Sequence, residues 1–293
     1  MPRKNYGRDL WEKMTEFASQ PDKDPVYECG IWTIEKLFFL SNYLAQFTQA
    51  MIGHPRFSEF IYVDMFSGSG ICQVSEGGRT RRYPGSSLLA AGCEKSFSKL
   101  LYIDENTENI KALETRVERL GTASAAFFLN RDVNTVIEEL RGYIPPKSLS
   151  VVFIDPYSLQ ISYESIRKLT SNRQMDLIIL FADRMDIGRN VEKYYYGNTG
   201  SKLDYFLGTD TDWRTEWDAL QNRTIANVCE LFADIYLDQL EKIGFVHSRK
   251  KIISGRQGPL YRLIYASRHE LGLKFWDIAL KEDLSGQQGL FGV

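Results

Sequence analysis

Residues 61 to 70 read Ile-Tyr-Val-Asp-Met-Phe-Ser-Gly-Ser-Gly, an apolar run of strand length followed by two closely spaced glycines. Gly68 and Gly70 have no Cβ atom, so the backbone can turn through positive φ there and lie close to a ligand. Open parallel sheets bind ligands just beyond the carboxyl ends of their strands. The sequence therefore predicts a buried strand at 60–65 that ends in a ligand-binding turn.

Two common glycine loops do not fit this pattern. A dinucleotide-binding loop reads Gly-x-Gly-x-x-Gly and opens a helix at once, but Gln73 stands at the third glycine position and the next helix start is at 85–87. A phosphate-binding loop would need Gly-Lys-Ser or Gly-Lys-Thr after the glycines, and neither is present. A plain tight turn with a solvated Asp64 remains the alternative.

Along the chain, apolar runs of strand length alternate with helix-length segments, which is typical of βαβ units around a parallel sheet. We expect strands at 60–65, 100–103, 125–129, 149–154 and 176–181, then an antiparallel hairpin of 245–253 and 259–267. We expect helices at 8–19, 32–53, 107–120, 134–143 and 224–243, and one that starts at Ser86 or Ser87, either of which is a candidate N-cap.

This pattern predicts an α/β protein with a mostly parallel sheet and a C-terminal antiparallel hairpin. We expect an N-terminal helical extension at 1–58 and a larger domain at 59–293. An insertion at about 183–222 interrupts that domain, because its sequence shows neither a clear helix nor a clear series of strands.

Composition and charge narrow the function classes. The 293 residues are 43% hydrophobic and 25% charged, which is ordinary for a globular chain. The net charge of −2 argues against a wholly basic nucleic-acid-binding surface. A local patch formed by Arg79, Arg81 and Arg82 could still contact phosphates of a nucleic acid; a solvated flexible loop is the alternative for this segment.

Cysteine, histidine and hydropathy patterns exclude further classes of site. Cys29, Cys72, Cys93 and Cys229 show no Cys-x-x-Cys spacing, so we expect reduced thiols and no metal cluster. His54, His247 and His269 are isolated in the sequence and are not spaced as metal ligands. The N-terminus is polar and no apolar run approaches 18 residues, so we expect no membrane span and a cytoplasmic protein.

Two acids follow predicted strands at the edge where the glycine turn lies. Asp104 could accept hydrogen bonds from both ribose hydroxyls of a nucleoside, or it could simply begin the next helix. Asp132 could accept a hydrogen bond from an adenine amine, although an Asp just before a helix is also favourable for the helix macrodipole.

The glycine turn and the end of the fourth strand carry a resemblance. The pattern Asp-x-Phe-x-Gly-x-Gly at 64–70 resembles the first motif of class I S-adenosylmethionine-dependent methyltransferases. The resemblance implies a doubly wound, Rossmann-like sheet and a cofactor site formed by Asp64, Phe66, Ser67, Gly68, Gly70, Asp104 and Asp132. In that family Asp64 would face the ammonium or sulfonium region of S-adenosylmethionine, directly or through water.

Asp155-Pro156-Tyr157 resembles the Asp-Pro-Pro-Tyr signature of methyltransferases that modify exocyclic amines. The resemblance implies that Asp155 and Pro156 orient an amine and that Tyr157 stacks on the base. One proline is missing here, which leaves the position of the Tyr157 ring open. The alternative is a turn after a buried strand, in which Pro156 ends the pairing and Tyr157 packs over the sheet edge.

Taken as a whole, the chain resembles the three-Cys-motif partner protein family, TcmP. The likeness lies in Trp32-Thr33-x-x-Lys36-Leu37, in 62–70, in Pro84-Gly85-Ser86-Ser87-Leu88-Leu89-Ala90, in 153–157, and in Tyr261 to His269 with Gly272 and Phe275-Trp276. It implies a three-cysteine companion protein, similar to radical-S-adenosylmethionine cluster proteins, as a partner. We therefore predict a methyltransferase acting on an amine or nucleic acid base. A scaffold or regulator of the companion is the alternative, and a dinucleotide-dependent oxidoreductase is the least favoured.

Overall fold

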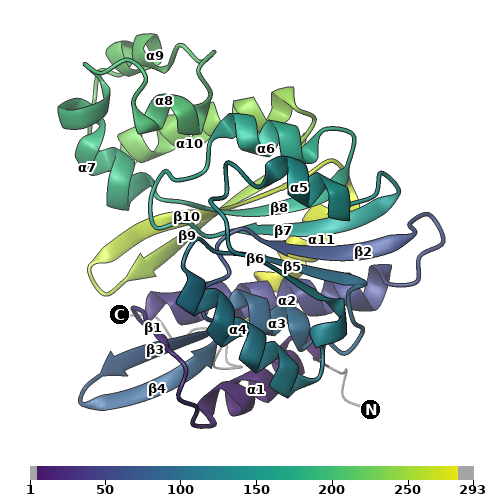
Figure 1. The fold of residues 1–293 in the computed structure, drawn as a ribbon. Helices are drawn as coiled ribbons and strands as arrows, with labels where there is room; N and C mark the ends of the chain where they lie inside the picture. The colour runs from purple at the N-terminus through teal and green to yellow at the C-terminus, as the bar shows by residue number, and fades with distance from the viewer. Residues whose placement is uncertain (1–4, 283–293) are drawn as a thin grey trace.

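The computed structural model describes residues 5–282 and has a central seven-stranded sheet with helices on both faces (Figure 1). The strands lie in the order β6 (Ala126–Leu129), β5 (Lys99–Ile103), β2 (Glu59–Asp64), β7 (Ser148–Ile154), β8 (Gln174–Phe181), β10 (Gly258–Ser267) and β9 (His247–Gly255). The first five are parallel, whereas β10 runs antiparallel to β8 and β9 antiparallel to β10. This is the doubly wound sheet of class I methyltransferases, as the sequence predicts.

Alternation along the strands divides the core into two halves. In β2, Tyr62 packs into one apolar cluster while Ile61 and Val63 pack into the other, because successive side chains point to opposite faces of a sheet. Burial on both faces explains why the parallel strands read as continuous apolar runs. The first cluster includes α1 (Tyr6–Ser19), α2 (Trp32–Met51), α3 (Ser86–Ala91), α4 (Thr107–Leu120) and α11 (Glu270–Ala279); the second includes α5 (Ile137–Tyr143), α6 (Tyr163–Thr170) and α10 (Ile225–Lys242).

The segment after Gly70 is a hairpin and not the expected long loop. β3 (Ile71–Glu76) and β4 (Arg79–Pro84) pair antiparallel, and β1 (Tyr27–Glu28) adds to β3 to give a second, three-stranded sheet. Both the β3–β4 hairpin and the β9–β10 hairpin project toward the left of Figure 1. Strand alternation separates Arg82 from Arg79 and Arg81, so the three arginines do not share one face. Helix α3 begins as expected, but Gly85 is its N-cap and neither Ser86 nor Ser87 caps it.

Residues 183–222 are mostly helical, which corrects the expectation of no clear elements there. Two π-helical turns, Asp183–Ile187 and Val191–Tyr195, flank α7 (Gly188–Asn190), and α8 (Lys202–Leu207) and α9 (Trp213–Ala219) follow. These helices gather with α10 at one end of the molecule (Figure 1). Asp204 connects them, since it accepts hydrogen bonds from the Trp213 Nε1 atom at 2.7 Å and the Arg214 Nη1 atom at 2.6 Å. Burial raises the pKa of Asp204, but these donors outweigh it and hold that pKa well below its usual range.

Outside 183–222, two further helices, α6 and α11, are absent from the sequence-based expectation. Helix α5 begins at Ile137, later than expected. All four cysteines are free thiols. Between residues 5 and 282, no helix combines the length and apolar character needed to cross a membrane.

Candidate active site

A cavity of about 510 Å³ lies beyond the carboxyl ends of β2, β5, β6 and β7. From β2 the chain first adds β5 and β6 on one side of that strand. It then returns to add β7 and β8 on the other side, so the direction in which strands are added reverses between β2 and β7. Such a reversal is where open α/β sheets bind ligands. The lining includes residues from the end of each of these four strands, from the start of α2, and from β1 and β3.

The glycine turn and Asp104 meet directly. The Gly68 amide donates to Asp104 Oδ2 at 2.9 Å, and the Ser67 amide donates to the Ile103 carbonyl at 2.8 Å. Gly68 has φ +56° and Gly70 has φ +85°, a conformation that glycine adopts without strain. At Gly70 a Cβ atom would also lie only 2.7 Å from Leu113 Cδ1. The turn is therefore held against β5, with both glycines on the cavity wall.

Asp104 has less capacity for a ligand than the sequence suggests. Besides Gly68, the carboxylate accepts from the Asn106 amide at 2.8 Å and from Asn109 Nδ2 at 3.2 Å, both on Oδ1. A carboxylate offers about four acceptor positions, so one remains, on Oδ2. Asp104 can take one ribose hydroxyl in this arrangement, and a second would have to displace Asn109.

Asp64 lies beneath the turn and does not line the cavity. Its side chain has no exposed surface, and its oxygens accept from Tyr62 Oη at 3.1 Å and from the Phe66 amide at 3.4 Å. Burial raises the pKa of Asp64 to about 7 against the opposing effect of the Ser86 and Tyr62 hydroxyls, and the nearby Asp155 charge adds to the rise. Asp64 therefore has no exposed surface through which it could contact a ligand in the cavity directly.

Phe66 and Ser67 do line the cavity. The Ser67 hydroxyl oxygen is buried and has no hydrogen-bond partner within residues 5–282. Burying a polar atom without a partner is unfavourable, so a ligand group that bonds to Ser67 would relieve this cost.

Asp155 is ion-paired with a lysine that the sequence analysis did not single out as a site residue. Lys36 Nζ, from the first turns of α2, bonds to Asp155 Oδ2, and both side chains line the cavity. Burial lowers the pKa of Lys36, but the charge of Asp155 outweighs it and the pKa is raised. Lys36 Nζ also lies 5.8 Å from the centre of the Tyr261 ring, whose hydroxyl is buried and unpartnered among the described residues.

The signal for Lys36 in the sequence is weak. It is a charged side chain in a helix in which 14 of 20 residues are buried, and lysine is rarely buried unless it is paired. Its partner lies 119 positions away, which no local pattern reveals. Tyr261, within a predicted strand, gives no signal of its own.

Pro156, Tyr157 and Asp132 also line the cavity. The Tyr157 ring is 68% exposed and meets the Tyr27 ring edge to face, with the ring centres 5.6 Å apart. Asp132 Oδ1 accepts from the amides of Asn134 at 2.9 Å and Thr135 at 3.3 Å. The carboxylate therefore stabilises the start of the following turn, and its Oδ2 atom remains available.

The arginine patch lies elsewhere. Arg79, Arg81 and Arg82 are absent from the cavity lining, and Arg82 Nη1 lies 3.4 Å from Asp22 Oδ1. The fully buried Arg116 binds the same carboxylate, with Nη2 at 2.9 Å from Oδ1. Asp22 and Arg82 thus help to fix the segment before β1.

Comparison with solved structures finds distant likenesses. Similar solved structures include protein LPL1258 from Legionella pneumophila, with 10% identity, TM-score 0.49, and coverage of 82% of this chain and 90% of that one. The O-methyltransferase TomG from Streptomyces achromogenes, in complex with S-adenosylmethionine, has 13% identity, TM-score 0.41 and 91% coverage of each chain. An rRNA methylase from Streptococcus thermophilus has 11% identity, TM-score 0.38, and coverage of 78% and 93%.

The chain has the class I methyltransferase fold. Its own strand order and the antiparallel β10 establish this, since each of these likenesses has a TM-score below 0.5. The sequence matches no protein-family model and no curated protein.

Proposed function

We propose that this protein is an S-adenosylmethionine-dependent methyltransferase whose acceptor is an amine or a nucleic acid base. One observation carries the proposal: a single cavity at the strand-order reversal joins the Gly68–Asp104 contact to the Asp155–Lys36 ion pair. The lining also fits such a cofactor, because Ser67 and Tyr261 present buried hydroxyls without partners in the described part of the chain.

The residues of the turn would hold the cofactor. S-adenosylmethionine, when bound, supplies a methyl group on a positively charged sulfonium centre. Gly68 and Gly70 would let the backbone approach the ligand closely. Asp104 Oδ2 would accept a hydrogen bond from one ribose hydroxyl, and Asp132 Oδ2 would accept one from the adenine amine. Asp64 contributes from beneath the turn by fixing the Phe66 amide.

Asp155 would orient the acceptor. Its Oδ2 atom is held by Lys36. Its Oδ1 atom has no hydrogen-bond partner between residues 5 and 282 and would accept a hydrogen bond from the amine. Methyl transfer depends chiefly on in-line positioning of nucleophile, methyl carbon and leaving group. A fixed carboxylate at the cavity wall provides that positioning, so no covalent intermediate with the protein is needed.

Calorimetry with S-adenosylmethionine and S-adenosylhomocysteine tests this proposal. We expect one equivalent to bind, and Asp104→Ala to weaken binding by at least about tenfold, as expected for the loss of a charge-assisted hydrogen bond. Glu114→Ala, which removes an exposed acid from α4, is the matched control and should leave affinity unchanged. Absence of binding to the wild-type protein at millimolar cofactor would overturn the proposal.

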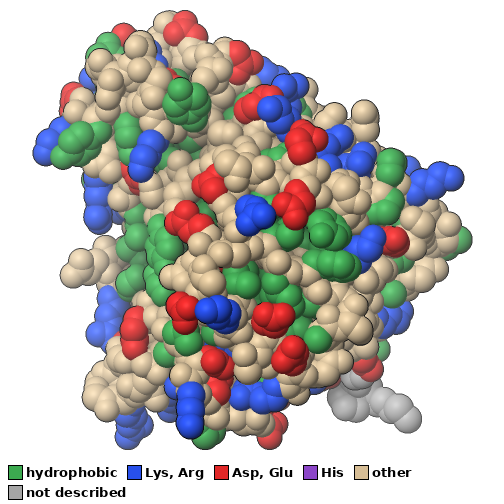
Figure 2. Space-filling view, in the orientation of Figure 1, with side chains coloured by type: hydrophobic (Ala, Val, Ile, Leu, Met, Phe, Trp, Pro, Cys, Tyr) green, Lys and Arg blue, Asp and Glu red, His purple; other side chains and the backbone are tan. Residues whose placement is uncertain are grey.

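A nucleic acid acceptor would use Arg79 and Arg81, which are exposed and have no ion pair within the described residues. Arg82 is already paired with Asp22. On the face seen in Figure 2, acidic and basic side chains are interspersed and no basic stripe appears. Binding of a single-stranded oligonucleotide that weakens with salt, and that Arg79→Gln with Arg81→Gln reduces, would support this acceptor class.

A second candidate is a partner of a three-cysteine companion of the kind expected for TcmP. The exposed Tyr27 and Tyr157 rings at the cavity mouth favour it, since exposed aromatic side chains are common at protein interfaces. Copurification with the companion, together with no methyl transfer by the isolated chain, would favour the partner role.

A further inference from the structure

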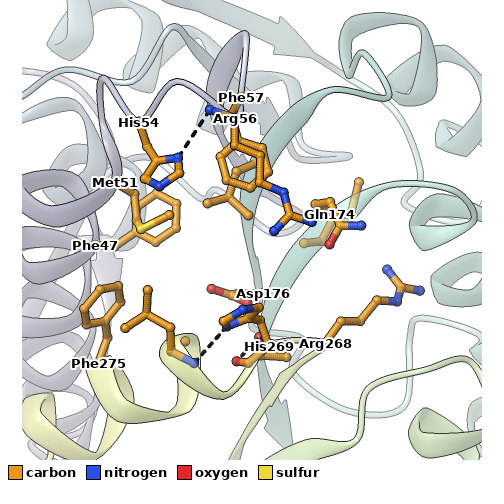
Figure 3. A pocket seen from close by; sticks show the side chains of 15 residues that line it. Phe47, Met51, His54, Arg56, Phe57, Gln174, Asp176, Arg268, His269 and Phe275 are labelled. Carbon is orange, nitrogen blue, oxygen red and sulfur yellow. Dashed lines mark hydrogen bonds between the residues drawn. The ribbon is translucent and has the colours of Figure 1, made fainter.

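A second cavity lies at the opposite edge of the sheet and shares no lining residue with the first. It has a volume of about 200 Å³ and is bounded by the end of α2, the segment before β2, the amino ends of β7 and β8, the end of β10 and the start of α11. Figure 3 shows its side chains: Phe47, Met51, His54, Arg56, Phe57, Gln174, Asp176, Arg268, His269 and Phe275 are labelled there. The methyltransferase proposal uses none of them.

One side of this cavity is apolar. Phe47 and Met51 of α2 lie next to Phe275 of α11 on the left of Figure 3. Aromatic rings and a methionine side chain form a surface on which a flat apolar group packs favourably. This wall fits an aromatic or compact aliphatic body.

Two imidazoles stand on the cavity with a defined orientation. The Nδ1 atom of His54 accepts from the Arg56 amide at 3.3 Å, and the Nδ1 atom of His269 accepts from the Leu271 amide at 3.1 Å. An Nδ1 atom that accepts a hydrogen bond assigns the proton of the neutral ring to Nε2. Both histidines therefore have an Nε2–H donor that is not used by the backbone.

The two arginines of the lining play different parts. Arg268 donates to the carbonyl oxygens of Arg173 at 2.6 Å and Ile243 at 2.8 Å, so it is a fixed positive charge with few donors to spare. Arg56 is exposed and makes no ion pair within residues 5–282. Its guanidinium extends across the cavity toward Gln174 in Figure 3.

Asp176 is the single acid among the lining residues. It is 6% exposed, and its Oδ2 atom accepts from Tyr43 Oη at 2.6 Å on the buried side. Arg268 is bonded to carbonyls of residues outside the lining, so Arg56 is the cation that extends across the cavity. An anion would bind beside Arg56.

We propose that this cavity binds a small aromatic carboxylate. The ring lies against Phe47, Met51 and Phe275, and the carboxylate accepts hydrogen bonds from Arg56, His54 and His269. A guanidinium matches the two oxygens of a carboxylate in a bidentate pair. The volume is below the roughly 300–1,000 Å³ of sites for drug-sized ligands, so the ligand is a one-ring or compact two-ring molecule.

Methionine methyl groups report on the two cavities separately. Met51 and Met175 line this cavity, whereas Met65 and Met185 line the first. We would label the methionine methyl groups of the full-length protein with ¹³C and titrate it with benzoate, following each resonance by NMR. We expect saturable shifts of Met51 and Met175 with a dissociation constant of about 1 mM, and no shift of Met65 or Met185.

Two arginine variants test whether Arg56 binds the carboxylate, one as the test and one as its control. Arg56→Gln should weaken benzoate binding by at least about fivefold. Arg79→Gln changes an exposed arginine that does not line this cavity and should leave benzoate binding unchanged. Folding of both variants is checked by their Met14 resonance, since Met14 is fully buried elsewhere. The proposal is overturned if benzoate shifts neither Met51 nor Met175, or if Arg56→Gln binds benzoate as tightly as wild type does. It is also overturned if benzyl alcohol binds as tightly as benzoate, or if inorganic phosphate gives the same shifts.

Discussion

Lys36 and Asp155 form a buried ion pair between the N-terminal helix α2 and the end of β7, across 119 positions of the sequence. The side chains are 7% and 21% exposed, so water screens their attraction only weakly. The pair fixes one carboxylate oxygen at the cavity wall and makes the residues before β2 part of the site. Helix α2 therefore contributes a charged side chain directly to the cavity wall beside Asp155.

Replacing Lys36 tests whether the pair serves the reaction. Lys36→Met leaves Asp155 without its partner, which should cost about 3 kcal/mol of unfolding free energy and reduce kcat for methyl transfer by at least about a hundredfold. Lys36→Arg keeps the charge and should recover part of both. Urea unfolding and a radiolabelled methyl transfer assay measure the two effects. If Lys36→Met loses stability but transfers methyl groups normally, the pair is structural only.

Asp155→Asn should separate cofactor binding from transfer. The amide keeps the shape of the side chain but loses the charge that attracts the amine protons, so we expect kcat to fall by at least about a hundredfold. The affinity for S-adenosylhomocysteine should stay within about tenfold, because the turn at 67–70 and Asp104 are unchanged. Calorimetry and single-turnover kinetics distinguish the two quantities. Equal losses in both would place Asp155 in cofactor binding.

The buried carboxyl of Asp64 should give a pH dependence of stability. Its pKa is about 7 in the folded protein against about 3.9 when exposed, so the folded state binds more protons between these values. Stability from this group is therefore present below about pH 4 and is lost as pH rises toward 7, by up to about 4 kcal/mol. Asp64→Asn removes the titration.

The measurement for Asp64 is the unfolding free energy of wild type and Asp64→Asn at pH 5 and pH 8, by urea denaturation. Relative to wild type, the variant should gain stability between pH 5 and pH 8. An identical change with pH in both proteins would show that Asp64 is ionised throughout.

The five parallel strands and several helix ends were predictable because they depend on local signals. Continuous apolar runs mark strands that are buried on both faces, and Gly121, at φ +80°, ends α4 where the sequence predicts. Strand β4 escaped prediction because Arg79-Thr80-Arg81-Arg82 belongs to a small sheet with exposed residues, and such a polar run reads as a loop. Residues 183–222 depend on Asp204 contacts across the segment, which local periodicity does not show.

In the candidate site, too, features set by local sequence signals were predictable and features set by long-range packing were not. The turn and Asp104 meet because consecutive parallel strands place their carboxyl ends at one edge, which the strand pattern predicts. The buried position of Asp64 and the partner of Asp155 depend on packing around Tyr62 and α2, which the pattern does not contain.

Gly68 and Gly70 should respond differently to alanine, although both have positive φ. At Gly70 the new Cβ atom would lie 2.7 Å from Leu113 Cδ1 and 3.1 Å from Leu88 Cγ, so Gly70→Ala should lower the unfolding free energy by about 3 kcal/mol through backbone strain and overpacking. At Gly68 no atom of residues 5–282 lies within 4 Å of the new Cβ, so Gly68→Ala should cost only about 1 kcal/mol.

The effect of Gly68→Ala should appear in binding instead, because the new Cβ atom would take up space in the cavity that we propose holds the cofactor. We expect Gly68→Ala to weaken S-adenosylhomocysteine binding by at least about tenfold. The affinity of the folded Gly70→Ala protein should fall by less. Calorimetry below the unfolding transition of each variant measures the affinity, and urea denaturation measures the unfolding free energy. Normal affinity in Gly68→Ala would mean that the backbone at the turn does not approach the ligand, and the cofactor site would then have to lie elsewhere in the cavity.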